Sequence, residues 1–154
     1  MGHSPRGRED TLAAVVLRRL PPLAFVCGAV LAALATALRA WRAHGAPSVL
    51  DPEGLRLFDA AMTQLQDVGL GLLAAGLLGR VAPSRLAGLA ALGFLASCVL
   101  FCGDVFPAAF RDDHATLGTA PVGGSFGIAA WLVLAAAGLA SLQSGRPTGD
   151  RDGA

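Results

Sequence analysis

Apolar residues gather in long stretches that short polar segments separate. Three stretches contain no charged residue, Pro22–Leu38, Leu86–Gly103 and Ala115–Gly145, and they are 17, 18 and 31 residues long. A helix needs about 20 mostly apolar residues to cross a bilayer. The pattern therefore predicts an all-α integral membrane protein with a four-helix transmembrane bundle. The helices are expected at about residues 22–40, 55–79, 86–103 and 121–142.

The polar segments set the expected domain organisation. Residues 1–19 predict a flexible cytoplasmic tail, with a helix from Leu12 onward left open. Residues 20–142 predict a four-span transmembrane domain and residues 143–154 a disordered cytoplasmic tail. Pro21 and Pro22 suit the start of the first helix, where a missing N–H costs nothing. The polar segment 104–120 predicts a loop before the fourth helix. An Ala-Thr-Ala sequence at 35–37 resembles a signal-peptide cleavage site, but the three apolar segments after it favour a retained helix.

Arginines are distributed unequally between the two sides of the expected bundle. Four spans place both termini on one side, which then holds eight arginines against four on the other. The larger group lies in the two tails and in the connection between the second and third helices. Because cytoplasmic segments carry the excess of basic residues, both termini are predicted to be cytoplasmic.

Composition excludes several classes of protein. Hydrophobic residues make up 54% of the 154 residues and charged residues 15%, whereas soluble domains have roughly 45–50% and 25%. These values exclude a soluble enzyme domain, a disordered chain and a secreted disulfide scaffold. The net charge is only +1 and no basic stripe is present, so nucleic acid is not expected as a partner. No phosphate-binding loop, nucleophile elbow or zinc-protease motif occurs in the sequence, and we expect neither catalysis nor a cofactor.

The second expected helix contains polar residues that are costly in lipid. Asp67 lies about 12 residues into it, which at roughly 1.5 Å per residue is near the middle of the membrane. A carboxylate at that depth normally needs a partner or water. Gln64, Asp67 and Gly71 share one helix face, which we expect to point into the bundle.

Other polar residues are expected in the same outer half of the bundle. They allow three interpretations: an ion pair that ties the first helix to the second or third, a proton path or small-solute site, or wet interfacial residues at Arg42 and Asp104. The candidate polar cluster comprises Arg39, Arg42, His44, Gln64, Asp67 and Asp104.

Cysteines and histidines give weaker indications. Cys98 and Cys102 are four residues apart and therefore share a helix face. The sequence leaves open whether they form a metal or redox pair or act as small buried hydrophobic residues. His44 and His114 fall in expected loops without a metal-binding spacing and are expected to be exposed to solvent. No metal site is predicted.

Small residues recur at a spacing of four along three of the helices. This spacing lets helix backbones approach closely in lipid and so favours a packed bundle. The residues are Gly28, Ala32 and Thr36 in the first helix, Gly71, Ala75 and Gly79 in the second, and Gly123 and Gly127 in the fourth.

Motifs at three places along the sequence bring the chain close to a known family. Residues 39–44 read R-A-W-R-A-H, similar to a G-A-F-G-A-H stretch, and residues 64–70 read Q-L-Q-D-V-G-L, similar to Y-Q-x-x-H-x-L. Residues 102–104 replace S-G-S, and a T-P-x-G-G motif with a Trp ten residues after the Pro corresponds to Pro121, Gly123, Gly124 and Trp131. In these motifs the chain resembles the domain of unknown function 423 family of small four-span bacterial inner-membrane proteins.

The departures from the family pattern are charged. Two glycines are replaced by Arg39 and Arg42, a histidine by Asp67 and a serine by Asp104. Two positive charges thus accompany two negative ones. Our hypothesis is that these four changes compensate each other electrostatically and that the chain is a divergent member.

The resemblance implies a multi-pass protein of the bacterial plasma membrane, in a family with no assigned biochemical role. Two functions are then open. The first is a non-enzymatic accessory or structural component that contacts the lipid bilayer and a membrane-protein partner or further copies of itself. The second is a small transporter or proton/solute channel that uses Asp67 with Arg39, Arg42 and Asp104.

Overall fold

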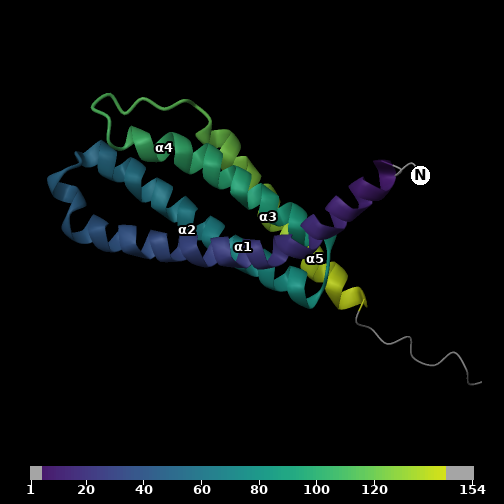
Figure 1. Cartoon of the computed structure of the whole chain (residues 1–154). Coiled ribbons are helices and arrows are strands. Elements are labelled where there is room, and N and C mark those ends of the chain that lie inside the picture. The colour runs from purple at the N-terminus through teal and green to yellow at the C-terminus, as the bar shows by residue number, and fades with distance from the viewer. Residues whose placement is uncertain (1–4, 145–154) are drawn as a thin grey trace, which may run out of the picture.

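A computed structural model describes residues 5–144 of the chain, and side chains over residues 20–143. Within that range the fold is entirely helical apart from short connections (Figure 1). The helices are α1 (Pro5–His44), α2 (Pro52–Val81), α3 (Arg85–Ser97), α4 (Gly103–Ala108) and α5 (Ala120–Ser144), with a 3-10 turn η1 (Ala46–Ser48) and a π-helical segment η2 (Cys98–Cys102).

Four helical segments are long and apolar enough to cross a membrane, as the apolar pattern predicts. They are Leu20–His44, Pro52–Val81, Arg85–Ala108 and Ala120–Gln143. Both ends of the described chain lie at the same end of the bundle (Figure 1), which an even number of spans requires. The sequence-based expectation of four spans is therefore confirmed.

The first helix begins much earlier than expected. α1 starts at Pro5, so most of the polar segment 1–19 is helix rather than a flexible tail, and Pro21 and Pro22 lie inside the helix instead of at its start. The residues between 9 and 20 are mostly Ala, Leu, Arg and Glu, which have high helix propensity. Residues 1–4 of the expected tail and residues 145–154 of the second tail lie outside the described range.

The third span ends later than expected. α3, η2 and α4 follow one another without a break from Arg85 to Ala108, so Asp104 and Pro107 lie in a helix and not in a loop. Pro107 costs little there because α4 ends one residue later, and only the last turn loses a hydrogen bond. The connection to α5 is correspondingly shorter, over residues 109–119.

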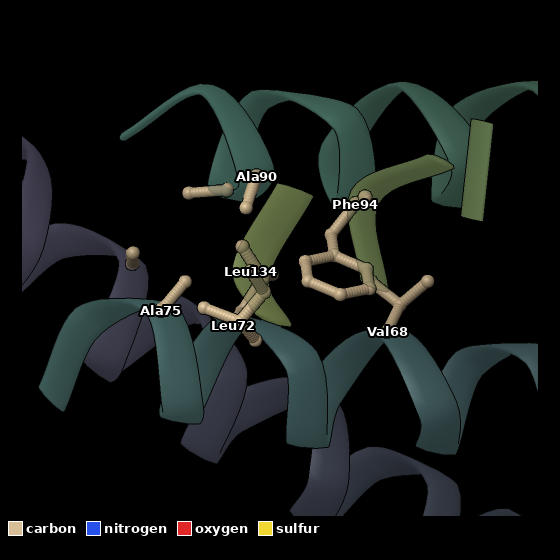
Figure 2. Close-up of a cluster of buried hydrophobic side chains, with 9 residues drawn as sticks. Val68, Leu72, Ala75, Ala90, Phe94 and Leu134 are labelled. Atoms are coloured by element: carbon tan, nitrogen blue, oxygen red, sulfur yellow. The ribbon is translucent and has the colours of Figure 1, made fainter. Parts of the chain in front are cut away.

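α2 is the central helix of the bundle. Half of its most apolar stretch is buried, compared with 17–28% for the other three spans. α1 packs almost entirely on α2, and α5 packs mainly on α3 (Figure 1). Figure 2 shows the core that joins α2, α3 and α5. Its labelled residues are Val68, Leu72, Ala75, Ala90, Phe94 and Leu134.

Glycines let the backbones of α1 and α2 touch. A Cβ atom on Gly28 would lie 2.6 Å from the backbone nitrogen of Leu73, and one on Gly76 would lie 2.6 Å from the backbone nitrogen of Phe25. No side chain can move aside at these two positions, because the neighbouring atoms belong to the backbone. The contact therefore requires glycine.

The substitution Gly28→Ala should push α1 away from α2. Overpacking a close contact costs about 1–3 kcal/mol, and we expect a loss of that size in the free energy of unfolding, measured by titration with denaturing detergent. The matched control is Gly138→Ala in α5, where an added Cβ meets nothing within 4 Å. Equal stability of the two variants would contradict the proposed contact.

Candidate functional site

The candidate polar cluster does not form one group. Arg42, Asp104 and Asp67 each occupy a separate place along the bundle, and no hydrogen bond or ion pair joins them within the described residues. Arg39 and His44 are exposed at the C-terminal end of α1. The expected compensation between the four charged departures is therefore not what the structure shows.

Arg42 pairs with Asp59, a residue that the sequence analysis did not single out. Its Nε and Nη2 atoms donate to the two carboxylate oxygens of Asp59, at 2.8 and 2.9 Å. Such a two-pronged bond fixes orientation as well as charge. The expected ion pair between the first two helices exists, but its acidic member is Asp59 and not Asp67.

Asp104 is only 2% exposed and organises the connection to α5. Its carboxylate accepts hydrogen bonds from the backbone amides of Leu117, Thr119 and Ala120, the last two at 2.7 and 2.9 Å. The Thr119 hydroxyl in turn donates to the Leu100 carbonyl at 2.8 Å. Asp104 thus satisfies the free N–H groups at the start of α5, and this role leaves it unavailable to a transported solute.

His114 holds the same connection to the start of α2. One ring nitrogen lies 3.1 Å from the Ala108 carbonyl oxygen and the other 3.1 Å from a carboxylate oxygen of Asp51. Both partners only accept hydrogen bonds, so both nitrogens must carry protons. The hydrogen bond to Asp51, and then that to Ala108, raises the pKa of His114 above its ordinary value of 6.5. His114 was expected to be exposed to solvent, but it is half-buried and links the connection before α5 to the start of α2.

The interaction between His114 and Asp51 should weaken in alkaline solution. A raised folded-state pKa means that the contribution of His114 to stability is complete below about pH 6.5 and is lost as the pH rises through the raised pKa. We expect His114 to titrate above 6.5 by NMR, and proteolysis within residues 109–119 to accelerate over the same interval.

The control for this titration is His114→Asn. Asn tolerates the positive φ of 47° that His114 adopts but cannot titrate, so its proteolysis should not depend on pH in that interval. Titration of His114 at or below 6.5, or the same pH dependence of proteolysis in the variant, would contradict a stabilising role for the His114–Asp51 interaction.

Asp67 lies in the middle of α2 and opens to the outside of the bundle. It is exposed and lines a hollow of about 120 Å³ between α2 and α5. Within the described residues no cation pairs with it. The shared face of Gln64, Asp67 and Gly71 is thus only partly inward, because Gly71 is buried against Phe94 while Asp67 is not. The hollow is lined by Gln64, Asp67, Val68, Phe94, Gly124, Gly127, Ile128 and Trp131.

Gln64, which lines the hollow, forms a hydrogen bond between α2 and α3. The Gln64 side-chain nitrogen donates to the hydroxyl of Ser97 at 2.7 Å, and Ser97 is fully buried. A Cβ on Gly127 would lie 2.9 Å from that hydroxyl oxygen, so the bond fits only under a glycine of α5. Ser97 gave no indication in the sequence, because a single serine in an apolar helix has no pattern.

The expected packing motif, Pro121, Gly123, Gly124 and Trp131, belongs to α5. A Cβ on Gly123 would lie 2.6 Å from the backbone nitrogen of Phe101, so α5 contacts the π-helical segment η2 through its backbone. Trp131 packs edge-on against Phe94, with ring centroids 5.0 Å apart. Gly124 and Trp131 also line the hollow, so one motif supplies both packing and the wall of the site.

Cys102 of η2 contacts the central helix α2. Cys102 Sγ donates to the Ala61 carbonyl of α2 at 3.4 Å, and both Cys98 and Cys102 are free thiols of intermediate exposure. Among the described residues, no group of three metal-ligating side chains occurs.

Four apolar spans, with α2 as the central one, define a small multi-pass membrane protein. The family model described as "Protein of unknown function (DUF423)" matches residues 38–124. The chain belongs to this family. The match includes the three motifs up to Gly124 and leaves Trp131 outside. Neither a curated protein nor a solved structure matches the chain.

Proposed function

We propose that the protein is a non-enzymatic accessory component of a bacterial plasma membrane, with both termini in the cytoplasm, and that it binds a transmembrane segment of another membrane protein at the hollow between α2 and α5. The observation that supports this proposal is the position of Asp67. A charged side chain near the middle of a bilayer is costly unless it faces a partner or water. Asp67 faces outward from this chain, so its partner comes from outside.

A proton or solute conductor is the second candidate. It has one supporting observation, because 120 Å³ beside Asp67 and Gln64 leaves room for several waters. The wall of the hollow that faces the bundle is formed by Val68 and Phe94, which are buried and apolar. Conduction also needs a series of polar groups across the membrane, and Arg42 and Asp104 are engaged elsewhere. We therefore favour binding of a transmembrane segment at the hollow, called lateral binding below, over conduction.

Photo-crosslinking in native membranes tests lateral binding. A photoreactive residue at Ile128, which lines the hollow and is 67% exposed, should give one discrete protein adduct. The matched position is Val30, which is 60% exposed on α1 and should give none. The Ile128 adduct should disappear when Gly124→Leu fills the hollow. Recovery of the monomer alone at Ile128 would contradict the proposal.

A further inference from the structure

We propose that the segment bound in the hollow is a transmembrane helix of a different protein with a lysine or arginine near its middle. This inference rests on the proposed function and deepens it by naming the chemistry of the partner. It follows from the charge of the hollow, the depth of that charge and the shape of the walls.

The hollow offers one unmatched negative charge. Asp67 is the only ionisable side chain among its lining residues, and the amide nitrogen of Gln64 already donates to Ser97. On the chain itself, Arg42 is bound to Asp59, and no ion pair joins Arg39 to Asp67 within the described residues. A cation is the group that offsets a desolvated carboxylate most directly.

The depth of Asp67 argues against a second copy of this chain as the source of the cation. Arg42 lies level with Asp59 and Ala32 level with Gly69, so two steps along each antiparallel helix place Asp67 level with Leu34. Arg39 lies five residues farther along α1, about 7.5 Å away in depth, so Arg39 of a second copy reaches Asp67 only with its side chain fully extended along the membrane normal. Two copies inserted with the same orientation keep these depths.

The remaining spans offer no cation either. Residues 22–38, 86–103 and 120–143 contain no Arg or Lys, and these ranges cover the levels of α1, α3 and α5 that correspond to Asp67. No span of the chain therefore carries a basic residue whose backbone is level with Asp67, and we take the partner to be a different protein.

The walls suit a long basic side chain. Gly124 has no side chain, and an added Cβ there would meet its nearest neighbour only at 4.0 Å, so a second helix can approach the α5 backbone closely. Ile128 and Trp131 provide an apolar rim for the methylene stem of Lys or Arg. The exposed ring of Trp131 adds attraction for a cation.

The test uses synthetic peptides of 20 residues in phosphatidylcholine vesicles that contain the full chain. One leucine-rich helix carries a central lysine, and its control carries leucine there. Energy transfer between labelled peptide and labelled protein measures binding. We expect the lysine peptide to bind about tenfold more tightly, and Asp67→Asn to remove this preference. Glu53→Gln, which removes a negative charge from α2 away from the hollow, should keep it.

The outcomes separate this inference from the proposed function. Equal binding of both peptides, or a preference that survives Asp67→Asn, would overturn the cationic partner. A persisting Ile128 adduct to another protein would then still support lateral binding. An Ile128 adduct with twice the mass of the chain would show a second copy in the hollow and would also overturn the inference. Absence of any protein adduct would remove the proposed function itself.

Discussion

The architecture depends on the backbone contacts that the glycines of α2 permit. Gly69 and Gly76 bring α2 against the backbone of α1, and Gly71 lies under the ring of Phe94 on α3. Lipid tails are as apolar as leucine, so helices in a bilayer associate through close packing and polar contacts more than through the hydrophobic effect. With α1 on one side and α3 on the other, α2 becomes the buried helix. Its polar side chains therefore bind residues of different neighbouring helices.

The same constraint explains the polar groups. A bilayer offers them no hydrogen bonds, and among the described residues every fully buried side-chain nitrogen or oxygen has a hydrogen-bond partner. Asp59 binds Arg42, Gln64 binds Ser97, and Asp104 binds the amides before and at the start of α5. Asp67 differs, because it opens outward beside two glycines of α5. A bundle that pairs Asp59, Gln64 and Asp104 internally and leaves the Asp67 carboxylate open lacks a partner on that side.

Hydropathy alone was sufficient to predict the number of spans, and the motifs identified the family, because both depend on local sequence. Side-chain partners were not predictable in the same way, since they depend on register. An antiparallel hairpin pairs residues equally far from its connection, which places Arg42 opposite Asp59 and keeps Arg39 away from Asp67. The expected first helix ended at residue 40, before Arg42, so the pairing of Arg42 with Asp59 was missed. Likewise, the role of Asp104 was not predictable, because it depends on the π-helical segment η2, which extends the third span beyond Asp104.

The measurement that tests the central claim most directly is the reaction of Asp67 with a hydrophobic carbodiimide, before and after purification from native membranes. A partner helix in the hollow predicts that Asp67 is protected in the native membrane and reacts once the chain is isolated in detergent. Asp59, bound to Arg42 in both settings, is the internal comparison and should not change. Equal reactivity of Asp67 in both settings would mean that nothing covers it, and would contradict the account.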